Sequence, residues 1–398
     1  MKKILIFSLA YYPRFISGAE AAIKEITDRI DPSDIEFHMV TVRFDMSDPK
    51  HEFVGNVHVH RVGFGNLYLS KILFIPLAAL KGISLNRKHH FSALWAMMTY
   101  MLMPIALMRI LGTKIPHILT LQDGDPYEKV FERWFIRPVT PLLDYGFRTA
   151  SLIQVISTFL GTWPEKRGYR GDIELIYNGA NPKNLYPEYS EKEVEELKQK
   201  LGKKDGDVYL LNASRLVYQK ANDDVIRALA LLPENVYFVL IGAGEDEEML
   251  RNVAKDEGVA ERVKFIGQLS RDEVPLYRNR TVADIFICPS RSEGLGNSFL
   301  SAMAAHLPVI ATQEGGLAEF IFDKKRNPDK DTTAWAVDKD SPEQIAGAVM
   351  DILTNPEQVK RVTQYAHKMV MEKYNWDIIA KDMRKKVFEK VLQSNNSY

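Results

Sequence analysis

A glycine-rich turn near residue 293 carries the residue types best suited to hold a phosphorylated ligand. An apolar run, VADIFICPS (282–290), leads into the turn SEGLG, and a helical stretch, NSFLSAMAAH (297–306), follows it. Glycines between a strand and a helix let backbone N–H groups approach a ligand closely, and the helix N-terminus favours anions. One carboxylate, Glu293, stands at the mouth of this turn. The pattern indicates a phosphate-binding βα unit, with an ordinary tight turn as the alternative.

Two cations follow another apolar run and could contribute to the same site. Arg215 comes directly after VYLLNAS (208–214), and Lys220 follows five residues later. An arginine can hold a diphosphate with its planar fork and a lysine with a point charge. Spacing alone fits equally well a solvated loop with two unrelated basic residues. The turn at Glu293 lies on a later strand of the same series, so both groups are expected to project toward one cleft.

Two further segments offer weaker candidates. Asp123 and Asp125 follow the apolar run HILTLQ and could chelate a divalent metal, but no histidine–carboxylate cluster is recognisable elsewhere. We therefore predict a polar loop and no metal. Gly18, in the segment Ser17-Gly18-Ala19-Glu20, opens a helix after the first apolar run. Contact with an anion and simple capping of the helix by Ser17 both fit this segment.

Other glycines and histidines favour structural roles. Gly242 and Gly244 lack the third glycine of a dinucleotide-binding fingerprint, so we interpret them as a turn and reject an oxidoreductase. His58 and His60 alternate with valines and therefore share one face of a strand. No carboxylate lies at a telling spacing from them, which favours a half-exposed strand face over a ligand site.

Composition excludes several classes of protein. The 398 residues suggest two domains, and 46% apolar and 26% charged residues are typical of a soluble globular protein. The formal net charge is zero, so nucleic acid is not an expected partner. Cys288 is the only cysteine, which leaves no disulfide framework and fits a reducing, cytoplasmic setting. The apolar run from Ala93 to Met108 is shorter than the roughly 20 residues needed to span a bilayer.

Short apolar runs separated by helical stretches form two series along the chain. Continuous rather than alternating apolar runs are typical of parallel sheets covered on both faces. The first series runs from ILIFSLA to IELIYNG and the second from VYLLNAS to LPVIAT, with a Pro-, Asn- and Tyr-rich boundary at 180–190. Ligands of doubly wound sheets bind beyond the carboxyl ends of the strands. Two such domains facing each other would place the site in the cleft between them.

The order of these elements resembles the retaining glycosyltransferases of family 4. The matching elements are the loop at Gly18, the strand end Ile176-Tyr177-Asn178-Gly179, the pair Arg215 and Lys220, the turn at Glu293, and Asn375-Trp376 before the last helix. The resemblance covers the whole chain and implies the α/β GT-B architecture, with two facing Rossmann-like domains. It implies an acceptor domain (1–185), a donor-nucleotide domain (186–375) and a C-terminal helix (376–398) that packs back on the first domain.

The resemblance also implies a role for each candidate. Arg215 and Lys220 would hold the diphosphate of a nucleotide sugar without metal, and Asp123 would lie near the acceptor. Retention of anomeric configuration is the family expectation, and no cofactor is implied beyond the nucleotide sugar, such as a UDP-sugar, as co-substrate. Donor binding would involve, in addition to Glu293, the residues Gly18, Asn178, Gly294, Leu295, Gly296, Asn297, Ser298 and Ser301.

Three positions depart from the family pattern. Ser301 stands where a second glutamate usually grips the ribose, and a neutral hydroxyl cannot accept two charge-assisted bonds. His306 replaces a glycine at a helix end that often needs positive φ, a region that histidine tolerates better than most residues. Gln122 replaces a histidine beside Asp123.

The sequence thus predicts a metal-independent, retaining hexosyltransferase that uses a sugar, polyol, lipid-linked or small-molecule acceptor. Two alternatives remain open: a nucleotide-sugar-binding protein with little turnover because of Ser301, and a metal-dependent transferase that uses Asp123 and Asp125. The apolar and basic segment at 70–90 favours a packed helix with a charged end, and peripheral contact with the inner membrane face is the alternative.

Overall fold

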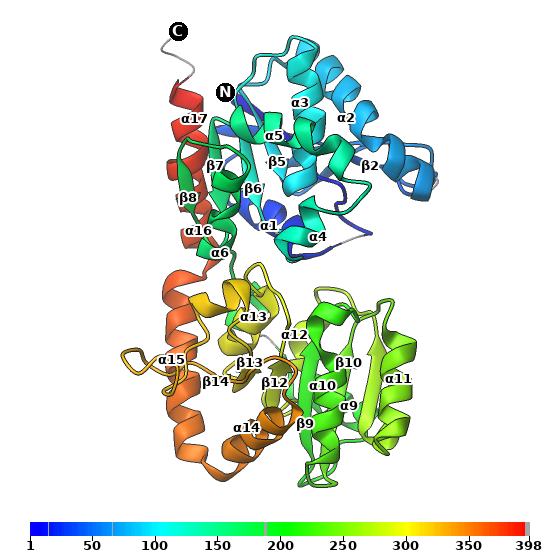
Figure 1. Ribbon diagram of the computed structural model, residues 1–398, viewed down its shortest axis with the longest axis vertical. Coiled ribbons are helices and arrows are strands. Elements are labelled where there is room, and N and C mark those ends of the chain that lie inside the picture. Colours follow the sequence, from blue (N-terminus) through cyan, green and yellow to red (C-terminus); the bar gives the residue numbers. More distant parts are fainter. Residues whose placement is uncertain (15, 66, 187–188, 395–398) are drawn as a thin grey trace. The chain divides into compact units, whose positions relative to one another are not determined.

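The chain forms two compact units in a computed structural model that describes all residues except 15, 66, 187–188 and 395–398 (Figure 1). The first unit contains residues 1–178 and 376–398, and the second contains residues 179–375. The division falls seven residues before the expected boundary at 185. Two hydrogen bonds explain this difference, because Asn181 N–H donates to Ser301 Oγ (2.9 Å) and Arg278 donates to Asn184 Oδ1 (3.1 Å) within the second unit. Residues 187–188 of the expected linker lie outside the described residues.

The first unit is built on an eight-stranded sheet in the order β3-β4-β2-β1-β5-β6-β7-β8. Its pairs are parallel apart from the antiparallel pair β3–β4, which the sequence did not predict. The strands are β1 (Lys2–Phe7), β2 (Ile35–Val42), β3 (His51–Val54), β4 (Val57–Val62), β5 (Ala93–Met97), β6 (His117–Leu121), β7 (Leu152–Val155) and β8 (Ile173–Leu175).

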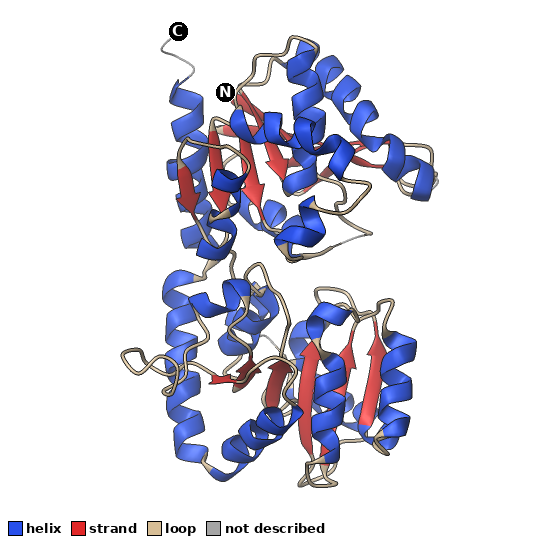
Figure 2. Cartoon of the chain, viewed as in Figure 1, coloured by secondary structure: helices blue, strands red, loops and turns tan. Residues whose placement is uncertain are grey.

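Helices flank these strands, as Figure 2 shows. Central strands such as β5 and β6 are buried at every position, which explains their continuous apolar sequences. The helices are α1 (Gly18–Thr27), α2 (Leu67–His89), α3 (Leu102–Ile110), α4 (Tyr127–Phe131), α5 (Thr140–Arg148), α6 (Thr158–Gly161), α7 (Trp163–Lys166), α16 (Trp376–Asp382) and α17 (Glu389–Ser394), with the short helices η1 (Thr99–Met101), η2 (Arg137–Val139) and η6 (Met383–Phe388).

The C-terminal helices complete the core of the first unit. Trp376 and Phe388 are almost fully buried, in one apolar cluster with Ile4 of β1 and Trp95 of β5. The Phe388 ring lies edge-on to Trp95 at a centroid distance of 5.0 Å. The chain therefore returns to its first sheet after finishing the second unit.

The second unit is built on a six-stranded parallel sheet in the order β11-β10-β9-β12-β13-β14. Its strands are β9 (Val208–Ala213), β10 (Val236–Ile241), β11 (Val263–Gly267), β12 (Ile285–Cys288), β13 (Val309–Ala311) and β14 (Trp335–Ala336). Its helices are α8 (Pro182–Leu185), α9 (Glu191–Leu201), α10 (Asn222–Ala230), α11 (Glu247–Asp256), α12 (Val274–Tyr277), α13 (Asn297–Ala304), α14 (Pro342–Thr354) and α15 (Pro356–Lys373), with η3 (Tyr218–Lys220), η4 (Ala260–Arg262) and η5 (Gly315–Glu319). Both units are thus doubly wound α/β folds, as predicted.

None of the described helices is both long and apolar enough to cross a membrane. The apolar run 93–108 instead forms the buried strand β5 and most of α3, as expected.

Candidate active site

The strand order of the second unit places two loops side by side. Strands β9 and β12 are neighbours, and the sheet continues from β9 to β10 and from β12 to β13 in opposite directions. At such a switch point the loops diverge, and ligands bind at the carboxyl ends of the two strands. The predicted cations follow β9 and the predicted glycine turn follows β12, so the topology brings both candidates to one edge.

An ion pair joins these two loops. The Lys220 ammonium contacts Glu293 Oε1, and the two side chains are only 15% and 9% exposed. Ser290 Oγ donates a second hydrogen bond to the same carboxylate oxygen (3.1 Å). Since an ammonium carries three protons, Lys220 keeps donors beyond the one directed at Glu293. A buried, oriented positive charge therefore stands at the switch point.

A second set of charges, which the sequence analysis missed, ties the same loops together. Arg291 hydrogen-bonds to Asp223 (3.0 Å) and Asp224 (2.9 Å) at the start of α10, and to Asp340 (2.6 Å). Its backbone N–H donates to Gln219 O (2.7 Å), next to Lys220. In the sequence, Arg291 was visible only as a cation beside the glycine turn, and no spacing rule connects such a cation to distant aspartates.

The electrostatics of this network follow from burial. Burial opposes ionisation of Asp223, but hydrogen bonds from Arg291 and Arg227 outweigh it and lower the pKa of this carboxyl. Burial and the neighbouring Asp223 raise the pKa of Asp224 to about 6. Two adjacent carboxylates thus share one guanidinium, which holds the two loops in register.

Close backbone approach explains the double glycine after β13. A Cβ at Gly316 would lie 2.0 Å from Gly294 O, and one at Gly315, where φ is +61°, would lie 2.2 Å from Glu293 O. Gly316 N–H donates to Glu293 O (2.9 Å). Gly296, with φ of +102°, then leads directly into α13, which begins at Asn297. The turn from Glu293 through Gly294, Leu295 and Gly296 is therefore packed against a second turn, with Asn297 and Ser298 in the first helical turn.

The glycines after β10 pack against the loop after β9, which carries Arg215 and Lys220. A Cβ at Gly242 would lie 1.9 Å from Ser214 O, and one at Gly244 would lie 2.0 Å from Leu216 O. Leu216 N–H donates to Ala243 O (3.0 Å). These contacts confirm the interpretation of Gly242 and Gly244 as a turn, and they fix the backbone on both sides of Arg215, whose side chain is exposed.

Two of the three departures from the family pattern are explained by local contacts. The Ser301 hydroxyl is buried; it donates to Asn297 O (2.8 Å) and accepts from Asn181 N–H (2.9 Å). Its donor hydrogen and one of its two acceptor lone pairs are therefore already used within the unit. His306 has φ of +57°, which confirms the predicted left-handed conformation at the end of α13. Its ring stacks on His367 at 3.9 Å.

The first unit has its own switch point, between β1 and β5. Asp123 follows β6 and accepts a hydrogen bond from Thr99 Oγ1 (2.9 Å), which follows β5. Burial raises the pKa of Asp123 to about 6. Met98, directly before Thr99, has a φ of +73°, which is rare for a residue with a side chain. A polar, partly strained edge thus forms around a buried carboxyl.

The remaining candidates of the first unit also lie at carboxyl ends of strands. Asn178 Nδ2 donates to Gln122 Oε1 (2.8 Å), so these two predicted positions contact each other. Gly18 opens α1 after β1 and is exposed. Ser17 N–H donates to Glu20 Oε2 (2.7 Å), which is part of a capping box at the start of α1. Asp125 forms an ion pair with Lys129 (3.0 Å), and its negative charge contributes to the raised pKa of Asp123.

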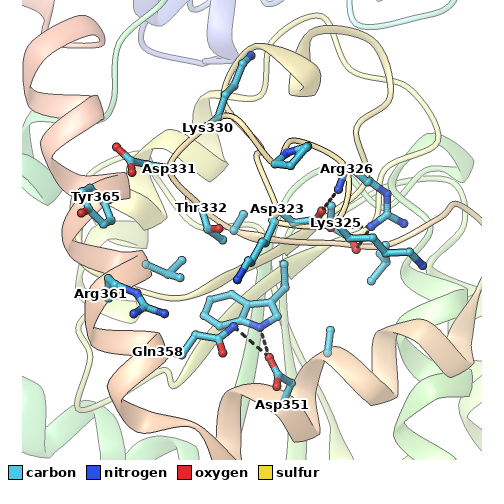
Figure 3. Close-up of a pocket in the computed structure, with 18 of the residues that line it drawn as sticks. Asp323, Lys325, Arg326, Lys330, Asp331, Thr332, Asp351, Gln358, Arg361 and Tyr365 are labelled. Atoms are coloured by element: carbon cyan, nitrogen blue, oxygen red, sulfur yellow. Dashed lines mark hydrogen bonds and ion pairs between the residues drawn. The ribbon is translucent and has the colours of Figure 1, made fainter.

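A separate pocket lies elsewhere in the second unit (Figure 3). Loop residues 323–332 and side chains of α14 and α15 line it, among them Lys325, Lys330 and Arg361. None of the residues at the β9–β12 switch point lines this pocket. It therefore does not belong to the candidate active site.

Comparison with known proteins identifies the class. A model of glycosyl transferases group 1 matches residues 193–369, and a model of glycosyltransferase family 4 matches residues 16–184. The chain is 25% identical over 407 residues to an uncharacterized glycosyltransferase of Methanocaldococcus jannaschii, and the match covers 96% of each protein. It is 30% identical over 240 residues to a GDP-mannose-dependent alpha-(1-6)-phosphatidylinositol monomannoside mannosyltransferase of Mycobacterium tuberculosis, covering 56% of this chain and 59% of that protein.

The fold agrees with these matches. The solved structure of sucrose-phosphate synthase from Thermosynechococcus elongatus superposes with a TM-score of 0.84 at 18% identity, covering 99% of this chain and 100% of that one. The chain belongs to the family 4 glycosyltransferases and has the GT-B fold.

The glycine packing predicts that Gly316→Ala disrupts the turn at Glu293. The new Cβ would press on backbone that cannot swing away, so we expect a loss of about 1–3 kcal/mol in the free energy of unfolding. Gly347→Ala is the matched control, because Gly347 lies exposed within α14 with open space around it. This control should be stabilised by about 0.5–1 kcal/mol. Denaturant titration of both variants tests the idea, and equal stability of the two would contradict it.

The buried carboxyl predicts a pH-dependent effect of Asp123→Asn. The pKa of Asp123 is raised in the fold to about 6, above the unfolded value of about 3.9. Ionisation of Asp123 therefore destabilises the fold. The protein keeps its full stability near pH 4, where the folded carboxyl is protonated, and loses part of it as the pH rises through 6. The variant should gain about 2–3 kcal/mol relative to the wild type between pH 4 and 7. Parallel pH–stability curves for Asp123→Asn and the wild type would refute the assignment.

Proposed function

We propose that this chain transfers a hexose from a nucleotide-diphosphate sugar to a hydroxyl acceptor, with retention of anomeric configuration and without a metal ion. The observation that carries the proposal is the oriented Lys220 charge at the β9–β12 switch point, in the same loop after β9 as exposed Arg215. A diphosphate is the ligand that a lysine point charge and an arginine fork on a glycine-rich edge suit best.

Each group has a distinct task in this proposal. Arg215 and Lys220 bind the diphosphate and stabilise the charge that develops on the leaving phosphate, the kind of preorganised electrostatic effect that dominates such reactions. Glu293 fixes the Lys220 ammonium and addresses the hydroxyls of the donor sugar. The backbone amides of Gly294 to Ser298 line the donor side. The leaving phosphate itself assists deprotonation of the acceptor hydroxyl.

The acceptor is assigned to the first unit, near Asp123 and the hydrogen-bonded pair Gln122 and Asn178. A lipid-linked acceptor is supported by the name of the mycobacterial relative, whose acceptor is a phosphatidylinositol monomannoside. Helix α2 also presents exposed Leu73 and Leu80 and ends with the cations Arg87 and Lys88. On these exposed leucines and terminal cations we retain peripheral contact with an anionic membrane surface as part of the proposal.

Donor screening followed by a chelation assay tests the proposed reaction. A thermal-shift panel of UDP-, GDP- and ADP-sugars should identify the donor, because a ligand that binds the native state raises its melting temperature. Transfer with that donor should continue in EDTA at a temperature well below unfolding. Loss of transfer that manganese restores would favour the metal-dependent alternative at Asp123 and Asp125. Donor binding without any transfer would favour the binding-only alternative.

The ion pair predicts that activity and stability respond differently to two variants. Lys220→Met removes the cation and leaves the buried Glu293 carboxylate without a compensating positive charge, which is costly. Lys220→Met/Glu293→Gln removes both charges, so it should recover most of the stability lost in the single variant. Transfer should fall at least about hundredfold in both, as expected on loss of a preorganised charge.

Lys204→Met, which removes an exposed lysine at the other end of β9, is the control and should keep full kcat/KM. Measurement of kcat/KM and of the denaturation midpoint separates the two effects. Near-normal transfer by either Lys220 variant would eliminate the proposed role.

A further inference from the structure

Five of the nine histidines of the chain gather at one edge of the first sheet. Strand register brings them together, because His38 of β2 is paired with His58 of β4, and His60 of β4 is paired with His51 of β3. The fifth, His89, ends α2, and its ring lies 4.4 Å from that of His38. His38 and His58 stack at 4.4 Å, nearly parallel. We call these five residues the histidine cluster (residues 38, 51, 58, 60 and 89). His58 is half-buried, as predicted for a half-exposed strand face, but His60 is buried, so the prediction is wrong for that residue.

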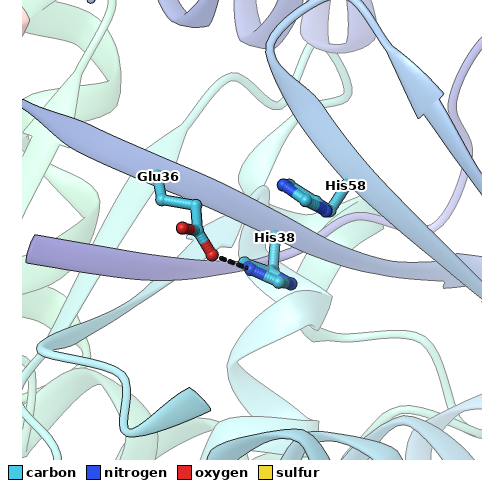
Figure 4. A group of neighbouring side chains, drawn as sticks. All are labelled: Glu36, His38 and His58. Atoms are coloured by element: carbon cyan, nitrogen blue, oxygen red, sulfur yellow. Dashed lines mark hydrogen bonds and ion pairs between the residues drawn. The ribbon is translucent and has the colours of Figure 1, made fainter. Parts of the chain in front are cut away.

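A carboxylate completes the group. Glu36, on the same strand as His38, places Oε1 2.6 Å from His38 Nε2 (Figure 4). One ligand atom each from Glu36, His38 and His58 lies within 4.8 Å of the other two. Among the described residues no other trio of histidine, cysteine, aspartate or glutamate comes this close together. The sequence did not indicate the trio because Glu36 and His38 lie on β2, whereas His58 lies on the neighbouring strand β4.

Hydrogen bonding orients the central imidazole. His38 Nδ1 lies 3.2 Å from His60 Nε2, so one nitrogen of His38 is engaged by His60 while the other faces Glu36. When the proton between the two histidines sits on His38 Nδ1, its Nε2 lone pair points at a carboxylate oxygen, and a cation is needed between them. This second contact is the kind that fixes the tautomer of a metal-binding histidine.

We propose that Glu36, His38 and His58 form a binding site for a divalent transition-metal ion of the zinc class. Two imidazole nitrogens and one carboxylate oxygen are a common ligand set for such ions. Around a tetrahedral ion, ligand atoms stand roughly 3.3 Å apart. Small rotations of Glu36 and His58, which are both half-buried, reach that spacing and admit the ion from solvent. A water molecule or another histidine of the cluster supplies the fourth ligand.

One group already occupies part of this site and would compete with an ion for the carboxylate of Glu36. The competitor is Lys3, whose ammonium lies 3.0 Å from Glu36 Oε1. Its side chain is 26% exposed and is free to swing into solvent when an ion enters.

The site is separate from the candidate active site. Glu36 and His38 lie in the first half of β2 and His58 in the first half of β4, at the amino ends of parallel strands. The polar edge around Asp123 lies at the carboxyl ends. A metal here would therefore pin β2, β4 and the end of α2 together and would take no part in sugar transfer.

Direct metal binding tests the proposal without reference to activity. The full chain is stripped with EDTA, exchanged into metal-free buffer, and titrated with zinc chloride in the presence of a chromophoric competitor. We expect one tight site per chain, a tetrahedral Co²⁺ absorption spectrum, and a higher melting temperature on adding Zn²⁺. Glu36→Gln and His58→Ala should weaken binding at least tenfold and abolish the Zn²⁺-dependent stabilisation.

Two further variants make the test decisive. Lys3→Met removes the competing cation and should strengthen Zn²⁺ binding. His367→Ala disrupts the His306–His367 stack of the second unit, which has no third metal-ligating group among the residues that the structure describes, and should leave the tight site intact. No tight binding by the wild type, or equal binding by wild type and Glu36→Gln, would overturn the proposal. Loss of transfer in EDTA that also occurs in Glu36→Gln would point to the Asp123 region and would leave the histidine site unaffected.

Discussion

The second unit depends on one constraint: a buried ammonium and a buried carboxylate must meet across two loops that leave neighbouring strands. Removing both groups from water costs several kcal/mol per ion, and the pair compensates only when its geometry is held. Three features hold it. Ser290 supplies a second hydrogen bond to Glu293, Arg291 clamps both loops through the start of α10, and glycines on the flanking turns let backbone meet backbone. A side chain at Gly316 or Gly244 would separate the turns that position the pair.

The two switch points use different chemistry for different partners. The second unit presents cations and backbone amides, which suit an anionic diphosphate. The first unit presents a buried carboxyl of raised pKa, a carboxamide pair and a hydroxyl, which suit the neutral hydroxyls of a sugar. The same doubly wound topology thus provides two edges, and the side chains at the strand ends determine what each edge can bind. The unusual backbone of Met98 lies at this polar edge, and such backbone strain is typical of functional sites.

The sequence predicted the parts of the fold that follow from local pattern. Continuous apolar runs identified twelve strands, and glycine positions identified the turn at Glu293. The missed strands β3 and β14 are short, and β3 alternates exposed and half-buried residues, so neither forms an apolar run. Arg291 and the histidine cluster were missed for another reason: their partners are distant in sequence. Asp223 lies 68 residues before Arg291, and His38 lies 22 residues before His60, so only strand order and register reveal these contacts.

Ser301 shows how one contact can change the meaning of a departure from a family pattern. Its hydroxyl lies between Asn297 O and Asn181 N–H, so it fastens the segment after Asn178 to α13. A glutamate would carry its carboxylate two carbons further from the backbone and could not occupy the same short space between these two groups. Position 301 can therefore hold either a glutamate that binds the donor or a serine that fastens residues 179–185 to α13, but not both. Under the proposed function, groups other than residue 301 therefore bind the nucleotide. Arg215 and the Lys220–Glu293 pair then contribute a larger share of the donor-binding energy than in relatives that have the glutamate.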